Sequence, residues 1–249
     1  MNTEDEIQPR LETTLFLGIS VDGKISSGEG DIRDPDRDWK RIHGVKEGLP
    51  QYYQIEQKTD LHSLITGKIL AKLGENEREI PKEKPESSSF MNFIVIDRKP
   101  WLNAHGVRSV ANRLRNLYLV TNNPSHPAHE LEAEIDNLTV ISYRKEIDFL
   151  DLFQRMHQDH CAERITIQSG GSLNAVLLRA GLIDHLLIIV APLLVGGNTT
   201  PTLIDGLSFR TESELTGIKA LRLTRCEELK DSFLRLEYDV INKTVIDPE

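Results

Sequence analysis

The chain has 249 residues, 39% of them hydrophobic and 28% charged, so it is long enough to bury a full core. Its formal net charge of −9 argues against nucleic acid and anionic membranes as partners, and its longest apolar run, residues 186–195, is too short to cross a bilayer. Two cysteines are too few for a disulfide framework or a zinc site, and the acidic N-terminus lacks the features of a signal peptide. We therefore expect the protein to be located in the reducing cytoplasm.

In chain order, we expect a mobile polar arm at residues 1–12 and then a single domain over residues 13–249. Short apolar segments predict strands at residues 15–19, 61–66, 93–96, 117–120 and 138–141. Helices are predicted over residues 52–58 and 148–160. Residues 26–38 are rich in Gly, Asp and Arg, and residues 74–89 are charged and lack an apolar period, so both predict loops.

The stretch from residue 165 to residue 197 is the most informative, because it predicts strand, glycine turn, helix, buried strand and a second glycine turn. Apolar residues recur at the spacing of one helix face: Leu173, Val176, Leu177 and Ala180. The helix would begin at Gly170-Gly171-Ser172 and end near Gly181, where a left-handed residue is favoured. Its first N–H groups have no partner within the helix, which suits an anion such as a phosphate, although two glycines also make a plain tight turn.

The C-terminal segments 221–224 and 233–240 alternate apolar and polar residues, as half-buried antiparallel strands do. Together with the apolar strands and interleaved helices, they predict a three-layer αβα fold with a mixed, mostly parallel central sheet and a C-terminal antiparallel hairpin. In such sheets the ligand lies at the carboxyl ends of the strands. Small or polar residues follow four strands there, at residues 20–22, 66–68, 121–123 and 168–170, and their convergence predicts a ligand site.

Four blocks occur in a familiar order: Ser20-Val-Asp-Gly-Lys-Ile25, Gln168-Ser-Gly-Gly-Ser-Leu-Asn174, Gly181-Leu-Ile-Asp184 and Ala191-Pro-Leu-Leu-Val-Gly-Gly197. Together they resemble the pyrimidine reductase of riboflavin biosynthesis, a family with the dihydrofolate-reductase-like fold. The resemblance spans residues 14–240. It implies NADPH-dependent reduction of a phosphorylated ribosylamino-pyrimidine, in which the ribose opens to a ribityl chain. It also implies a homodimer, for which residues 186–190 and the final hairpin are the expected interface.

The chain departs from the family's usual pattern at several positions. The usual glutamate of the second block is Gln168, its next glycine is Ser169, and the glutamate after Asp184 is His185. The glycine after the second strand is kept as Gly67, but the threonine that follows it in the family is lost. These changes put the substrate in doubt more than the cofactor. The zinc-deaminase patterns of the bifunctional members, His-x-Glu and Pro-Cys-x-x-Cys, do not occur, so we expect neither deamination nor a metal.

The resemblance also assigns roles to residues. Backbone N–H groups at the helix start would hold the cofactor pyrophosphate: Ser169, Gly170, Gly171, Ser172 and Leu173. Gly67 and Lys68 would contact the cofactor from the neighbouring strand end. Thr121 and Asn122 would face the adenosine ribose or its 2′-phosphate, or form only a turn.

On the substrate side, Asp22 and Lys24 match the family's positions near the reacting carbon. The Asp22 carboxylate would orient an amino or hydroxyl group, and Lys24 would hold a phosphate or stabilise a forming alkoxide. Ser20 and Gln168 would bind substrate beside them. The alternative is that Asp22 and Gly23 only form a turn.

Two other functions stay open. A pterin reductase closer to dihydrofolate reductase would need a buried carboxylate on the helix after the first strand, where Glu47 and Glu56 cannot be placed from sequence. A catalytically idle nucleotide-binding paralogue is the third alternative, and the loss of the family glutamate at position 168 favours it.

Overall fold

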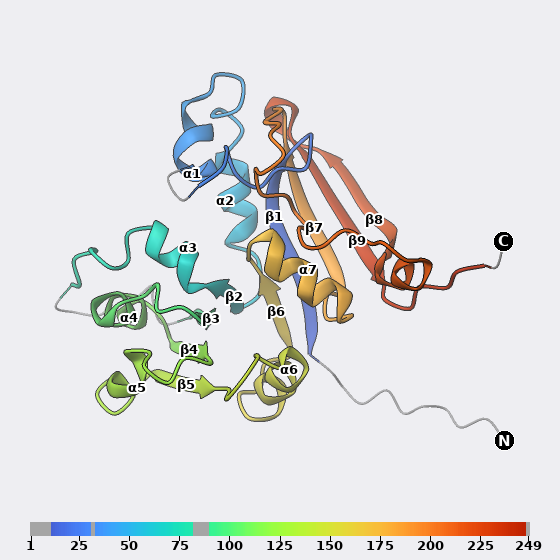
Figure 1. The fold of residues 1–249 in the computed structure, drawn as a ribbon. Coiled ribbons are helices and arrows are strands. Elements are labelled where there is room, and N and C mark those ends of the chain that lie inside the picture. The colour runs from blue at the N-terminus through green and yellow to red at the C-terminus, as the bar shows by residue number, and fades with distance from the viewer. Residues whose placement is uncertain (1–10, 31–32, 82–89, 248–249) are drawn as a thin grey trace.

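A single nine-stranded sheet organises the chain (Figure 1). The computed structural model describes residues 11–30, 33–81 and 90–247; most of the expected N-terminal arm and residues 82–89 of the expected loop lie outside them. The strand order is β5-β4-β3-β2-β6-β1-β7-β9-β8. The strands are β1 (Glu12–Ser20), β2 (His62–Thr66), β3 (Asn92–Ile96), β4 (Asn116–Thr121), β5 (Leu138–Ser142), β6 (Arg164–Ile167), β7 (His185–Ala191), β8 (Ala220–Glu228) and β9 (Leu234–Ile241).

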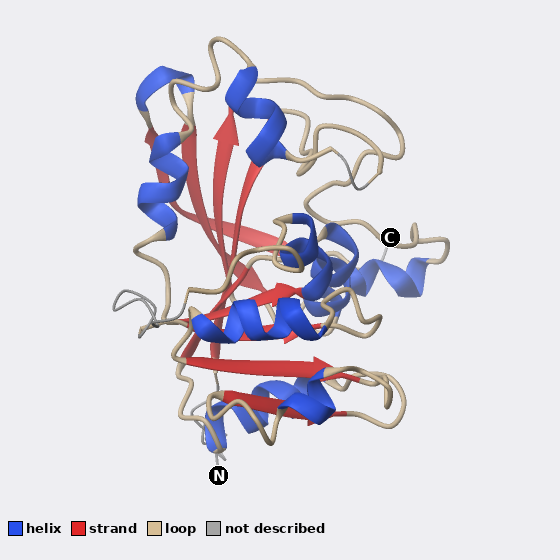
Figure 2. Cartoon of the chain, turned by 90° about the vertical axis from the view of Figure 1, so that its left-hand side faces the viewer, coloured by secondary structure: helices blue, strands red, loops and turns tan. Residues whose placement is uncertain are grey.

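Strands β1 to β7 run parallel, whereas β9 pairs antiparallel with β7 and β8 pairs antiparallel with β9. The predicted mostly parallel sheet with an antiparallel hairpin is therefore confirmed. The sheet is strongly twisted, so the strands at its two ends lie at a steep angle to each other in Figure 2.

Helices cover both faces of the sheet and make the expected three layers. The helices are α1 (Pro35–Asp38), α2 (Pro50–Glu56), α3 (Gly67–Lys72), α4 (Ala104–Asn112), α5 (Ala128–Leu131), α6 (Phe149–Gln158) and α7 (Gly171–Arg179). The inward residues of α6 and α7 share one core with Leu15 and Leu64. The opposite face carries two separate cores: α3, α4 and α5 pack around Ile65, and α2 packs around Phe16. Residues of both cores line one cavity: Ile65 and Leu70 from the first, and Leu49 and Ile189 from the second.

The predicted strands and the helices at 52–58 and 148–160 are present, but α1, α3, α4 and α5 were not predicted. The apolar face expected for α7 is only partly buried: Leu177 is buried and Leu173 packs partly buried against the core. The buried residues of α7 are Gly171, Asn174, Ala175 and Leu177. Val176, at 51%, and Ala180 are exposed, and the helix start at Gly171 packs against the loop that contains Thr202 and Asp205. No helix in the part of the chain that the structure describes is both long and apolar enough to cross a membrane.

Candidate active site

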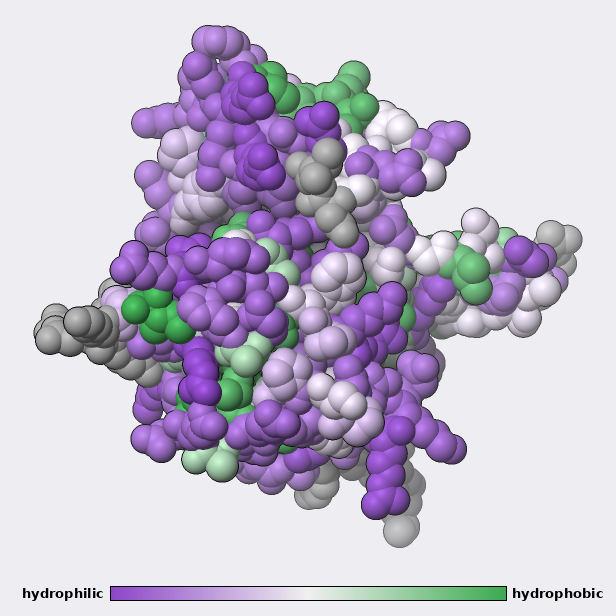
Figure 3. All heavy atoms as spheres, turned by 60° about the vertical axis from the view of Figure 1, so that its left-hand side comes forward, coloured by the Kyte–Doolittle hydropathy of each residue, from purple (hydrophilic) through white to green (hydrophobic). Residues whose placement is uncertain are grey.

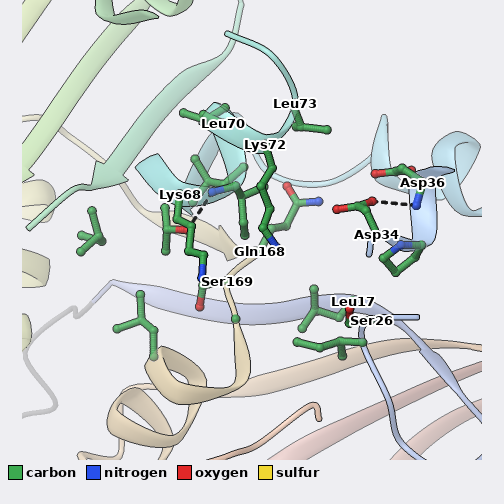
Figure 4. Close-up of a pocket in the computed structure, with 18 of the residues that line it drawn as sticks. Leu17, Ser26, Asp34, Asp36, Lys68, Leu70, Lys72, Leu73, Gln168 and Ser169 are labelled. Carbon is green, nitrogen blue, oxygen red and sulfur yellow. Dashed lines mark hydrogen bonds between the residues drawn. The ribbon is translucent and has the colours of Figure 1, made fainter. Parts of the chain in front are cut away.

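A large cavity opens at the carboxyl ends of the parallel strands, between α2 on one side and α3 on the other (Figure 4). Its volume is about 1930 Å³. Pockets for single drug-sized ligands measure roughly 300–1,000 Å³, so this one has room for two ligands side by side. The surrounding face is mostly hydrophilic, with hydrophobic side chains gathered in patches (Figure 3).

The start of α7 forms one wall of the cavity. The helix begins at Gly171 with Gly170 as its N-cap, as the sequence predicted. Both glycines line the cavity together with Ser169, Ser172 and Leu173. A Cβ atom on Gly170 would meet nothing within 4 Å, so a ligand can approach this backbone closely. The first N–H groups of a helix have no partner within it, and here they border the cavity.

Gly171 has a different environment from Gly170. A Cβ atom there would overlap the carbonyl oxygen of Thr202 and crowd the carboxylate of Asp205. That carboxylate accepts two hydrogen bonds from Thr202, through its N–H at 3.0 Å and its hydroxyl at 2.6 Å. Gly171 therefore allows the loop to pack on the helix, whereas Gly170 leaves the cradle open.

Four residues at the neighbouring strand ends were expected to contact the cofactor, and two of them line the cavity. Lys68 lines the cavity, and its Nζ lies 5.2 Å from the centre of the Trp101 ring. Gly67 is buried against the carboxylate of Asp97 and leaves no space for a side chain. Asn122 lines the cavity, while the buried Thr121 hydroxyl donates to the backbone oxygen of Asp97 at 2.8 Å. Gly67 and Thr121 thus support the wall rather than face into it.

Ser20, Asp22 and Lys24 are brought together, but not among the described residues that line the cavity. The Asp22 carboxylate accepts from the Ser20 hydroxyl at 2.6 Å and from the N–H groups of Val195 and Gly196 at 3.1 and 2.6 Å. The Ser20 hydroxyl, more than the two N–H groups, lowers the pKa of Asp22 to about 2. Lys24 Nζ donates to the backbone oxygens of Gly197 and Thr200. The charged groups of Asp22 and Lys24 thus hold the 193–200 loop beside the site. The catalytic roles expected for these two residues stay predictions.

Gln168 lies on the cavity wall next to a carboxylate that sequence reasoning did not place. Its Nε2 donates to Glu56 Oε1 at 2.5 Å, and its Oε1 accepts from the Ser63 hydroxyl at 3.0 Å. Burial raises the pKa of Glu56, the hydrogen bond from Gln168 opposes this, and the charge of Asp36 adds to it. Glu56 is the last residue of α2, which lies between β1 and β2, and this position was the signal that could have found it.

Aromatic side chains line the same end of the cavity. Tyr52 stacks on Phe16 with ring centres 4.9 Å apart, and burial raises its pKa. Burial also raises the pKa of Tyr53, whose hydroxyl donates to Asp36. This end suits a flat heterocycle, because a ring can stack there beside groups that donate and accept hydrogen bonds.

The other end of the cavity carries cations. Arg98 and Lys99 follow β3 and line the cavity near Asn122. Arg98 also lies 3.7 Å from Glu146. Near this end, His126 is buried against Asp97, and its Nε2 lies 3.1 Å from that carboxylate. The described ranges contain no group of three side chains placed to hold a metal ion.

Comparison with known proteins gives a consistent result. The family model for the RibD C-terminal domain matches residues 13–234. The chain is 31% identical over 239 residues to the 2,5-diamino-6-ribosylamino-4(3H)-pyrimidinone 5′-phosphate reductase of Methanothermobacter thermautotrophicus, which covers 93% of this chain and 96% of that protein. It is 23% identical to the protein of the same name from Archaeoglobus fulgidus, over 88% of this chain and 94% of the relative.

Solved structures share the fold. RibD of Acinetobacter baumannii superposes with a TM-score of 0.65 at 16% identity, over 94% of this chain. The present chain spans 59% of that longer protein. The riboflavin biosynthesis reductase Rib7 of Saccharomyces cerevisiae superposes with a TM-score of 0.55 at 14% identity, over 94% of this chain and 92% of the yeast chain.

Proposed function

Since the chain belongs to the RibD C-terminal domain family, we propose that it is an NADPH-dependent reductase of a phosphorylated ribosylamino-pyrimidine. The observation that carries the proposal is the cavity, which is large enough for a dinucleotide and a substrate and has an open glycine cradle at a helix start between its two ends. The relatives named as pyrimidinone phosphate reductases match nearly the whole chain, which supports the substrate class.

The residues present fit a nicotinamide dinucleotide. Its pyrophosphate would lie against the N–H groups at the start of α7, where Gly170 leaves room for it. When bound, the cofactor supplies a hydride from its nicotinamide ring. Lys68 would contact it from α3, while Gly67 and Thr121 would act only through the wall they support.

The preference for NADPH over NADH would come from the cationic end of the cavity. Arg98, Lys99 and Asn122 line this end, and the extra phosphate of NADPH carries the charge that two cations favour. The adenosine half would therefore point toward β4 and the nicotinamide toward Gln168.

The substrate would occupy the other end, with its heterocycle near Tyr52 and Gln168. Ser20, Asp22 and Lys24 would act here by fixing the 193–200 loop, and Lys24 would reach the substrate only if that loop moved. We also propose a homodimer and a cytoplasmic location. For the dimer, β8 exposes Leu221 and Leu223, which are 44% and 53% exposed.

A pterin is the second candidate substrate, and one observation favours it. Such a reductase needs a carboxylate on the helix after the first strand, and Glu56 occupies that place on the cavity wall. Glu47, the other acid considered, accepts a hydrogen bond from the Gly44 N–H and leaves 43% of its side chain exposed.

The test is a titration of the purified protein with NADPH and with NADH, followed by nicotinamide fluorescence. Cofactor oxidation is then measured with a ribosylamino-pyrimidine phosphate and with a dihydropterin. Tight NADPH binding with turnover of the pyrimidine supports the proposal. Turnover of the pterin alone would replace it with the second candidate, and absence of binding to either nucleotide would contradict both.

A further inference from the structure

The amide of Gln168 is held in one orientation between two partners from different elements. Ser63 has its hydroxyl hydrogen directed at Gln168 Oε1, so the NH₂ group faces the other way, toward Glu56 Oε1. Ser63 is 1% exposed and lies in β2, while Glu56 ends α2. Figure 4 shows Gln168 reaching into the cavity between α3 and the segment that carries Asp34 and Asp36.

We propose that Glu56 is the proton donor of the reduction and that Gln168 positions it. This inference rests on the proposed function, because it assumes a substrate that accepts a hydride and a proton. The carboxylic acid of Glu56 would face the reacting end of the substrate from α2, opposite the wall that α7 and β6 provide.

A glutamine at position 168 is the residue that such an arrangement requires. If residue 168 were a glutamate, two carboxyl groups would lie within hydrogen-bond distance of each other, and they would have to share a proton. A neutral amide instead donates to Glu56 and leaves a single acid in the site. With glutamine after β6, the single acid at this place in the site is Glu56 on α2.

The chemistry balances with one hydride and one proton. The glycosylamine nitrogen pushes its electron pair toward the anomeric carbon, a carbon–nitrogen double bond forms, and the ring carbon–oxygen bond breaks. Glu56 gives its proton to the departing ring oxygen, which becomes a hydroxyl. When bound, the reduced nicotinamide dinucleotide would supply the hydride that the anomeric carbon accepts. The electron pair would then return to nitrogen, and Glu56 would regain a proton from water.

The surroundings of Glu56 favour its acid form. Burial, the largest cause, raises its pKa; the hydrogen bond from Gln168 lowers it, the nearby charge of Asp36 raises it, and the net direction is upward. The charged and titratable groups that line the cavity around it are Arg33, Asp34, Asp36, Tyr52, Tyr53, Lys68 and Lys72. Of the two aspartates, Asp34 accepts from the Asp36 N–H at the start of α1, and Asp36 accepts from the Tyr53 hydroxyl, so both already have structural partners.

The first test compares Glu56→Gln with the matched control Glu47→Gln. The glutamine keeps an oxygen that can accept from Gln168, so the fold and NADPH binding should be unchanged. General acids contribute roughly 10²–10⁴-fold, so we expect kcat to fall about 100-fold or more in Glu56→Gln and to stay unchanged in Glu47→Gln. The wild-type kcat should decrease as pH rises through the raised pKa, and this decrease should be absent in Glu56→Gln.

Two further readouts separate a proton donor from a structural residue. Added formate should restore part of the kcat of Glu56→Ala, since a small acid can enter the space left. Carbon-13 NMR of protein labelled at glutamate side-chain carboxyls should show one resonance that titrates above the usual range, and Glu56→Gln should lack it.

Wild-type kcat with an unchanged pH profile in Glu56→Gln would overturn the inference. If Glu56→Gln failed to fold, a wild-type NMR titration with no raised carboxyl pKa would overturn it equally. Failure of the proposed function itself looks different, because the wild-type protein would then not oxidise NADPH with the pyrimidine at any pH.

Discussion

Gly171 packs so closely against the carbonyl oxygen of Thr202 that a Cβ atom there would overlap it, whereas its neighbour Gly170 faces open space. The two glycines can therefore be separated by mutation. Gly171→Ala should lower the free energy of unfolding by about 1–3 kcal/mol, the usual cost of overpacking. Thermal or urea unfolding checks this.

Gly170→Asp should leave stability unchanged or higher and weaken NADPH binding about tenfold or more. Gly170 has φ −77° and ψ 157°, which any residue can adopt, and aspartate is a favourable N-cap. Its charge would repel the pyrophosphate, and about 1.4 kcal/mol of repulsion gives the tenfold loss. Gly170→Ala is the uncharged control and should weaken binding less. Equal NADPH affinity in wild type and Gly170→Asp would contradict the proposed position of the pyrophosphate at the start of α7.

Asn174→Ala should destabilise the protein by about 2 kcal/mol. The fully buried Asn174 side chain accepts from the Ser169 hydroxyl at 2.5 Å and donates to the Leu203 oxygen at 2.8 Å. Its loss leaves two polar groups without partners. The melting temperature should fall by roughly 4–8 °C, while Ser172→Ala, at an exposed side chain of the same helix, should change it little. An unchanged melting temperature in Asn174→Ala would show that water replaces both bonds.

Asp22→Asn should lower stability at neutral pH but not in acid. The pKa of Asp22 is about 2 in the folded chain, against an ordinary value of 3.8, so its ionised form favours folding. This contribution is complete above pH 4 and disappears as pH falls toward 2. Melting temperatures of the two proteins should therefore differ at pH 7 and converge only as the pH falls to about 2. An equal difference in melting temperature at neutral and at acid pH would mean that the carboxylate charge is not the cause. Asp136→Asn, at an exposed turn, is the control.

Replacing both Arg98 and Lys99 with alanine should raise the dissociation constant of NADPH about 10- to 100-fold and leave that of NADH within about threefold. A hydrogen bond to a charged group contributes about 1.5–3 kcal/mol, which sets this range. Fluorescence titration measures both constants. Arg108→Ala is the control, because Arg108 pairs with Glu134 on another surface. A parallel loss for both cofactors would place the 2′-phosphate elsewhere.

Leu223→Asp should convert the proposed dimer into a monomer. Leu223 is 53% exposed on β8, and a charge at an apolar interface is costly. Light scattering at micromolar concentration measures the mass. Side chains alternate along a strand, so Arg222→Ser changes the opposite face and should leave the dimer intact. A wild-type monomer at this concentration would rule out the dimer directly.

The strands could be predicted because parallel strands buried on both faces are nearly continuous apolar runs. The helices α3, α4 and α5 could not. The inward face of α4 includes Gly106 and Ser109, whose small side chains let the helix pack closely but break the apolar period. In α7 the polar Asn174 is buried for its hydrogen bonds while Val176 is exposed, so counting apolar residues gave only part of the inward face.

The site could be predicted only as far as strand ends determine it. The start of α7 at Gly171 followed from local chemistry, since glycines precede an apolar helix there. The surroundings of Asp22 could not be predicted from local sequence, because they depend on how the 193–200 loop returns across the sheet. Glu56 was one of two acids that sequence could not separate, and its contact with Gln168 joins residues that are 112 positions apart.

The position of β1 in the sheet has a consequence for how the chain folds. Its two neighbours are β6 and β7, so the first strand pairs with segments that begin only at Arg164 and His185. Strands β2 to β5 lie side by side in sequence order and can pair as they leave the ribosome. Backbone amides of β2 to β5 should therefore gain protection from hydrogen exchange before those of β1 during refolding. The cavity, which lies between these two halves, would be completed in the last step.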